Sequence, residues 1–187
     1  MSDPGAILLS GPVGSGKTTL VLEIGDVLDD RGERYALVDL DWLAWVHLAP
    51  DTTHTVHEVL IENLRAVWGT YRRAGVERLV LARYLTRREQ LDSIRHALPD
   101  VDIVAVHLAV PAPVVRERLG RRDTGATLAE HLTLASAGAQ IPPFEDLTVT
   151  DSGDRRPHDI ALEILRRTGW IAAVDPPGSH EPGRGRA

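Results

Sequence analysis

Short apolar runs alternate along the chain with longer stretches in which apolar residues recur every three or four positions. The short runs are typical of buried parallel strands. They predict five strands, at residues 6–10, 35–40, 78–82, 102–108 and 147–150. The longer stretches have the spacing of amphipathic helices. They predict helices after the first strand, over residues 57–74 and 86–98, after Pro113, over 127–139 and over 159–168.

Strands that alternate with helices predict an α/β domain. We expect three layers, with a mainly parallel five-stranded sheet between helices on both faces and right-handed connections. In such a sheet, ligands bind beyond the carboxyl ends of the strands. The predicted domain covers residues 1–174, and residues 175–187, which are rich in Pro, Gly and Arg, are expected to be a disordered tail.

Two boundaries carry specific expectations. The second strand is expected to continue through Leu40, so that side chains two residues apart would face the same side. Thr86, with Glu89 three positions later, matches the capping-box pattern and predicts a helix that begins there.

A phosphate-binding motif follows the first strand. Residues 11–18 read G-P-V-G-S-G-K-T, which is the G-x-x-x-x-G-K-[ST] pattern of the P-loop. Its glycines allow backbone N–H groups to turn inward around an anion. The order strand, glycine-rich loop, helix is the one the motif requires, and the helix N-terminus adds a positive field. The chain is therefore predicted to have a P-loop NTPase domain.

The motif assigns roles to individual residues. Lys17 is expected to contact the β- and γ-phosphates, and the hydroxyl of Thr18 suits a magnesium ion that keeps several of its waters. The predicted nucleotide-binding residues are Gly11, Pro12, Val13, Gly14, Ser15, Gly16, Lys17, Thr18 and Thr19.

Two aspartates follow the second strand, at positions 39 and 41. A phosphoryl-transfer enzyme needs a group that orients or deprotonates the attacking hydroxyl, and an Asp commonly supplies it. Asp39 is predicted to act in catalysis and, with Asp41, to contact the acceptor substrate. The alternatives are a helix cap and a water-mediated contact to magnesium.

The third strand ends without an acid. Many P-loop proteins place a magnesium-binding Asp there, whereas this chain continues Ala82-Arg83-Tyr84. Arg83 is therefore predicted to lie near the substrate or the phosphates, and the alternative is a surface charge.

Arginines are concentrated between residues 116 and 122. A mobile segment that carries Arg can close over a nucleotide and neutralise charge during phosphoryl transfer. Arg118 and Arg122 are four residues apart and share a helical face, so both are predicted to be catalytic residues of an Arg-rich lid. A solvated helix face is the alternative.

Composition narrows the range of functions. The chain has 187 residues, a formal net charge of −6 and no cysteine. The negative charge argues against nucleic-acid binding, and the lack of cysteine excludes disulfides and thiolate chemistry. No stretch approaches the length of a membrane span, and the start lacks the pattern of a signal peptide. We expect a cytoplasmic protein, and the sequence leaves its oligomeric state open.

Histidines and tryptophans give weaker indications. His54 and His57 are three residues apart, but no third metal ligand lies at the spacing of a known motif. We therefore expect His54 in a loop and His57 at the start of a helix rather than a metal site. Trp68 is expected in the core. Trp42 and Trp45 could pack around a substrate pocket or belong to the core.

The chain resembles small P-loop kinases of the nucleoside monophosphate kinase-like group, and in particular the bacterial ATP-binding proteins of the AAA_33, adenylylsulfate-kinase-like and zeta-toxin-like type. The resemblance rests on the P-loop, on Val38-Asp39-Leu40-Asp41, on residues 118–122 and on residues 148–170. It implies ATP and Mg²⁺, transfer to a small-molecule hydroxyl, and a loop at 151–156 near the adenine. Adenylylsulfate kinases carry a Gly between their acidic pair, where this chain has Leu40.

Two functions remain open at this point. The first is a kinase that transfers the γ-phosphate of ATP to a hydroxyl of a small molecule. The second is a nucleotide-binding regulatory module or slow NTPase without phosphotransfer. The chain shows no N-K-x-D guanine signature, which argues against a GTPase.

Overall fold

Strands and helices alternate through the computed structural model, which describes residues 5–138 and 143–172. The predicted tail at 175–187, and the last residue of the helix predicted over 127–139, lie outside these ranges. The elements follow in the order β1 (Gly5–Ser10), α1 (Lys17–Asp30), β2 (Tyr35–Asp39), α2 (Leu40–Leu43), α3 (Val56–Arg73), β3 (Arg78–Ala82), α4 (Arg88–Ala97), β4 (Asp102–Ala109), α5 (Ala112–Arg122), α6 (Gly125–Gly138), β5 (Leu147–Thr150) and α7 (Pro157–Arg167).

The five strands form one parallel sheet in the order β2-β3-β1-β4-β5. The predicted fold class is thus confirmed. β1 is central and pairs with β3 on one side and with β4 on the other. The loop after β1 lies where the strand order changes direction, which is the place where parallel α/β sheets bind ligands.

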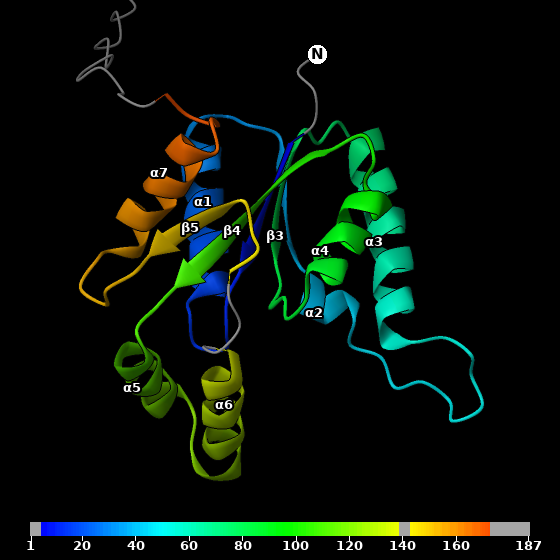
Figure 1. Cartoon of the computed structure of the whole chain (residues 1–187). Helices are drawn as coiled ribbons and strands as arrows, with labels where there is room; N and C mark the ends of the chain where they lie inside the picture. Colours follow the sequence, from blue (N-terminus) through cyan, green and yellow to red (C-terminus); the bar gives the residue numbers. More distant parts are fainter. Residues whose placement is uncertain (1–4, 139–142, 173–187) are drawn as a thin grey trace, which may run out of the picture.

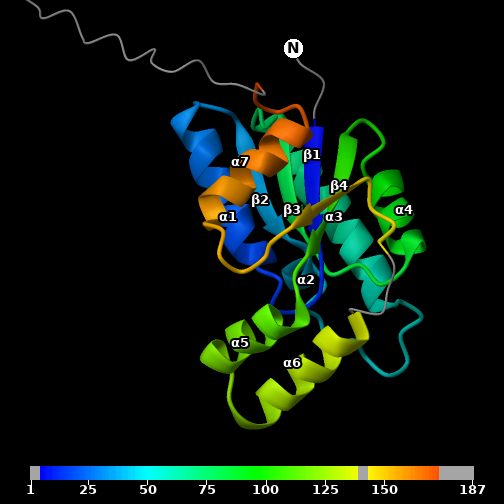
Figure 2. The ribbon, with the colours of Figure 1, turned by 60° about the vertical axis from the view of Figure 1, so that its left-hand side comes forward.

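Helices cover both faces of the sheet. Figures 1 and 2 show α1 and α7 on one face and α3 and α4 on the other. β1 is buried along its whole length, because both of its faces are covered. Ile7 and Leu9 pack with α1 and α7, whereas Ala6 and Leu8 pack with α3 and α4.

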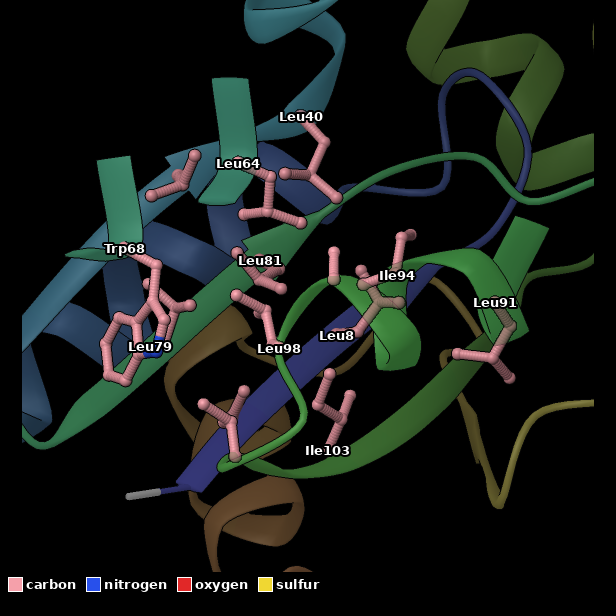
Figure 3. Packing of buried hydrophobic residues seen from close by; sticks show 14 of the residues in the cluster. Leu8, Leu40, Leu64, Trp68, Leu79, Leu81, Leu91, Ile94, Leu98 and Ile103 are labelled. Atoms are coloured by element: carbon pink, nitrogen blue, oxygen red, sulfur yellow. The ribbon is translucent and has the colours of Figure 1, made fainter. Parts of the chain in front are cut away.

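The core beneath α3 and α4 also anchors α2 (Figure 3). Leu40 is fully buried beside Leu64 and Leu81 in this cluster. Truncating a buried leucine to alanine costs about 2–5 kcal/mol. Burial of Leu40 therefore holds the start of α2, and the two aspartates that flank it, in a defined position.

Two sequence expectations were wrong in detail. β2 ends at Asp39, and Leu40 begins α2, so the strand does not continue outward. The burial of Leu40 and the capping of α2 by Asp39 explain the early turn. Helix α4 begins at Arg88, because Gln90, rather than Glu89, accepts hydrogen bonds from the N–H groups of Thr86 and Arg87. The other predicted boundaries agree to within two residues.

Helices α5 and α6 form a hairpin beyond the carboxyl ends of the strands (Figure 2). Their contact is a small apolar cluster of Val115, Leu119 and Ala135, and Val13 of the P-loop packs against it. The hairpin is therefore seated directly on the phosphate-binding loop. No helix in the described parts of the chain is long and apolar enough to cross a bilayer.

Candidate active site

The loop between β1 and α1 is shaped by glycines with left-handed backbone angles. Gly14 and Gly16 have φ values of 82° and 92°, a region that side chains with a Cβ rarely adopt. A Cβ added to Gly14 would also lie 3.0 Å from Leu119 and 3.1 Å from Val115 of α5. Glycine at position 14 is thus required both by the curl of the loop and by the helix above it.

The N-terminus of α1 is left without its usual protein partners. Gly16 provides no side-chain cap, and the first turn contains no acidic residue. Helix geometry leaves the N–H groups of the first turn free, and their partial positive charge attracts anions. Helix α3 is different, because Thr55 and Glu58 form a complete capping box there. The end of α1 is therefore suited to a phosphate group.

Lys17 is the only lysine in the chain. Its Nζ donates hydrogen bonds to the carbonyl oxygens of Gly11, at 2.8 Å, and Pro12, at 3.1 Å. Burial lowers the pKa of Lys17 to about 8, although the carboxylates of Asp41 and Asp39 oppose this shift. A polyphosphate beside the ammonium would favour its charged form and so offset the loss of hydration.

A cavity of about 480 Å³ opens over the P-loop. Its size is in the range of small-molecule sites. It brings together four groups of side chains predicted from the sequence: the P-loop, the two aspartates, two arginines of α5 and the loop after β5. The lining residues that bear on the chemistry are Val13, Gly14, Ser15, Gly16, Lys17, Thr18, Thr19, Asp39, Asp41, Arg118, Arg122 and Asp151. Of the predicted residues, Gly11, Pro12 and Arg83 lie outside this lining.

Asp39 and Asp41 reach the cavity through a helix turn. Asp39 is the N-cap of α2, and its Oδ1 accepts a hydrogen bond from the N–H of Asp41 at 3.0 Å. Burial raises the pKa of Asp41, and the charge of Arg83 opposes that rise. The aspartates therefore converge as predicted, but as cap and first turn of a helix and not as alternate residues of a strand.

Arg83 lies beside this pair, at the position where many P-loop proteins carry an acid. Burial lowers the pKa of Arg83, and Asp41 and Asp39 oppose the shift. Within the described parts of the chain, its buried Nε and Nη1 have no hydrogen-bond partner. The buried Nδ1 of His57 and Oγ of Ser15 have none either. Such atoms are costly to bury unless a ligand or water completes their bonds.

The two predicted lid arginines are both engaged with acids. Arg118 donates a hydrogen bond to Asp151 at 2.7 Å, and Asp151 also accepts from the N–H of Gly153. Arg122 pairs with Asp123 at 2.9 Å. Hydrogen bonds from Arg122 and His131 lower the pKa of Asp123 to about 2. Both guanidinium groups border the cavity, and each is hydrogen-bonded to a carboxylate of the protein.

Other members of the arginine run face solvent. Arg121 is largely exposed and pairs with Glu117 one helical turn away. Such a pair on an open surface contributes little stability. The His54 and His57 pair gains no third ligand, because the described residues contain no group of three His, Cys, Asp or Glu side chains that could hold a metal.

Comparison with solved structures gives the same architecture. A sugar kinase from Janibacter sp. is similar with a TM-score of 0.59 at 18% identity, over 89% of this chain and 95% of that one. The APS kinase of Mycobacterium tuberculosis, in complex with AMPPNP and APS, is similar with a TM-score of 0.59 at 22% identity, over 90% and 99%. A gluconokinase from Sinorhizobium meliloti gives 0.58 at 22% identity, over 91% and 96%. The chain therefore shares the P-loop fold of these three kinases.

Sequence comparison adds no closer relation to this P-loop kinase fold. No protein-family profile matches the chain, and no curated protein matches it. The assignment of the fold therefore rests on architecture, and the roles of individual residues rest on the geometry of the site.

The structure contains one polar cluster that the sequence did not predict. The side chain of Glu145 is 2% exposed and lies 3.5 Å from Nδ1 of His107. Burial acts to raise the pKa of Glu145, but hydrogen bonds from His107 and Ser10 outweigh it and hold the pKa at about 2. Ser10 directly precedes the P-loop and also accepts a hydrogen bond from the N–H of Leu85. A polar residue, Ser10, at the end of an otherwise apolar strand was the one feature of the sequence that could have indicated this cluster.

Proposed function

We propose that the chain is an ATP-dependent kinase that transfers the γ-phosphoryl group to a hydroxyl of a small molecule. The observation that carries this proposal is the single cavity that Lys17 and the P-loop share with Asp39 and Asp41. Phosphoryl transfer is catalysed chiefly by positioning and by charge stabilisation. A cavity that holds both the phosphate-binding groups and the two aspartates can supply both effects.

The donor half would bind the triphosphate. The uncapped end of α1 and the inward-turned backbone of residues 11–16 fit its oxygens, and the buried Oγ of Ser15 would gain a partner. Lys17 would contact the β- and γ-phosphates. A magnesium ion held by the Thr18 hydroxyl would neutralise charge on the triphosphate.

The acceptor half would prepare the nucleophile. In this proposal Asp39 accepts the proton of the acceptor hydroxyl while the hydroxyl oxygen forms a bond to the γ-phosphorus. The bond from that phosphorus to the β–γ bridging oxygen breaks, and ADP leaves. Asp41 and Arg83 would hold the acceptor in place, because both lie beside Asp39.

Arg118 and Arg122 would stabilise the charge that spreads over the transferred group. Both border the cavity from α5. In this structure, Arg118 pairs with Asp151 and Arg122 pairs with Asp123. Exchange of these carboxylates for phosphate oxygens would couple nucleotide binding to a shift of the α5–α6 hairpin.

Three solved structures with this fold support transfer to a small molecule. The neighbours include a sugar kinase, a gluconokinase and an APS kinase. Their low identity to this chain leaves its acceptor to be identified by experiment.

The single lysine offers a direct test of nucleotide binding. An amine-acylating reagent should modify Lys17 and the terminal amine, and mass spectrometry distinguishes the two. Excess Mg·ATP should protect Lys17 alone, because the triphosphate covers its ammonium group. Equal acylation of Lys17 with and without ATP would remove the basis of the proposal.

Turnover is tested with γ-labelled ATP and a pool of metabolites. The native chain should transfer label to an organic product, and Lys17→Ala should reduce this by about 10² or more, because the cation that contacts the phosphates is lost. Asp100→Asn, a change at an exposed site away from the cavity, is the matched control. Protection by ATP without any labelled product would favour the regulatory module or slow NTPase.

A further inference from the structure

Two tryptophans beside the aspartate pair are exposed to solvent. Trp42 is 68% exposed and Trp45 is 78% exposed. Their rings stack on each other, with centroids 5.0 Å apart and planes 16° from parallel. Indole rings are large apolar surfaces, and burying one is strongly favourable. A stacked pair left in water therefore calls for an explanation that a single exposed apolar residue does not.

The geometry of α2 places this surface next to the candidate active site. Leu40, Leu43 and Ala44 pack against the core, which fixes the inner side of the helical turn. Trp45 follows the C-cap Ala44 and lies three residues after Trp42 and four after Asp41, the spacings at which side chains on one helical turn are neighbours. The indole pair therefore adjoins Asp41, which lines the cavity, whereas the indoles and Arg83 lie outside that lining.

The polar groups near the two indoles include both hydrogen-bond donors and acceptors. Asp39 and Asp41 are acceptors, whereas the buried Nε and Nη1 of Arg83 are donors that have no partner in the described parts of the chain. The carboxylates and the guanidinium also offset one another in charge. A hydroxyl group both donates and accepts hydrogen bonds, so several hydroxyls on one molecule would satisfy this set, whereas a single charged group would not.

Resting on the proposed kinase function, we propose that the acceptor is a neutral ring-shaped polyol, such as a sugar or a cyclitol. Its apolar C–H face would lie on Trp42 and Trp45, and its hydroxyls would bond Asp41 and Arg83 and present one oxygen to Asp39. A purely aromatic alcohol would use the indoles but leave the buried donors of Arg83 without partners. An anionic open-chain polyol would be opposed by the two carboxylates and offers no flat face.

Ligand-detected saturation-transfer NMR tests this assignment without using tryptophan as the reporter. The probes are D-glucose and myo-inositol as ring polyols, D-gluconate as an anionic open-chain polyol and benzyl alcohol as an aromatic alcohol. We expect saturation of the ring polyols, strongest at the C–H protons of one face. Trp42→Ala and Trp45→Ala should each weaken binding by about tenfold, because each removes part of the surface on which the ring lies. Neither change should unfold the protein, because both indoles are exposed.

The matched control is Leu22→Ala, which removes another exposed apolar side chain, 57% exposed on α1, and should leave polyol binding unchanged. The inference is overturned if neither ring polyol binds, if gluconate or benzyl alcohol binds in their place, or if both tryptophan variants bind like the native chain. These results are separable from the kinase proposal. Polyol binding without phosphorylation by Mg·ATP would overturn the kinase proposal, whereas ATP protection of Lys17 without polyol binding would overturn this inference alone.

Discussion

Two clusters of polar side chains lie near the carboxyl edge of the sheet, and they differ in whether their buried nitrogen and oxygen atoms have hydrogen-bond partners. The Glu145 cluster, formed by Ser10, His107 and Glu145, satisfies itself. The Arg83 cluster, formed by Asp39, Asp41, His57 and Arg83, leaves three buried nitrogens without partners among the described residues. The first lies between β1, β4 and β5, and the second follows β2 and β3.

The difference separates structural polarity from polarity reserved for a ligand. A completed buried network stabilises and fixes the elements that contribute to it. An incomplete one costs free energy in the ligand-free protein and is retained where binding completes it. Substitutions in the Glu145 cluster should therefore reduce stability, whereas substitutions in the Arg83 cluster should reduce turnover and leave stability nearly unchanged.

The largest effect is expected for Asp39→Asn. Asparagine caps a helix about as well as aspartate, so α2 should keep its start and the melting temperature should change little. It cannot accept the proton of the acceptor hydroxyl, and general-base catalysis contributes about 10²–10⁴ in rate. Steady-state kinetics with the identified acceptor, together with a thermal melt, measures both quantities. A melting temperature that falls together with activity would mean that the residue acts only as a cap.

A smaller effect on turnover is expected for Arg83→Met. Methionine keeps much of the aliphatic stem but removes the donors, so the KM for the acceptor should rise by about tenfold to a hundredfold, because a charged hydrogen bond contributes about 1.5–3 kcal/mol. The KM for ATP should not change, and the unfolding free energy should not fall. Arg87→Met, at an exposed site in the next turn of chain, is the control. Loss of stability in Arg83→Met would show that this cluster is also structural.

The smallest effect on turnover, with the clearest effect on stability, is expected for Glu145→Gln. The folded pKa of Glu145 lies at about 2, below its ordinary value of 4.5. Its contribution to stability is therefore fully present above pH 4.5 and is lost as the pH falls toward 2. At pH 7 the variant should lose about 1.5–3 kcal/mol, and the difference from the native chain should shrink on acidification.

Denaturant unfolding at several pH values measures this difference, and Glu62→Gln, at an exposed site on α3, is the control. ATP protection of Lys17 should persist in folded Glu145→Gln. A loss that is the same at pH 3 and pH 7 would show that the charge of Glu145 is not the source of its contribution.

The P-loop could be recognised in the sequence because it is a local motif whose glycines, Lys17 and Thr18 stand within eight residues, and the structure places residues 13–19 in the lining of the cavity. The sequence also placed Asp39 and Asp41 at the mouth of the site. The strand predicted through Leu40 was wrong, however. The chain turns into α2 because Leu40 is buried against residues of α3 and β3, which are distant in the sequence.

The remaining parts of the site could not be predicted for the same reason. Glu145 meets Ser10 and His107 from three different segments, so no spacing along the chain reveals their contact. The exposure of Trp42 and Trp45 depends on which side of a single helical turn faces the core. Asp151 holds Arg118 from a distance of 33 residues in the sequence, which periodicity in α5 alone does not disclose.

The close approach of α5 to Gly14 has a mechanical consequence. Atoms of Leu119 and Val115 lie only 3.0 Å and 3.1 Å from the place where a Cβ at that position would be, so the helix rests on the loop at this glycine. We therefore expect the α5–α6 hairpin to close by rotating about this contact. Its far end would then move most, and the P-loop would keep its shape.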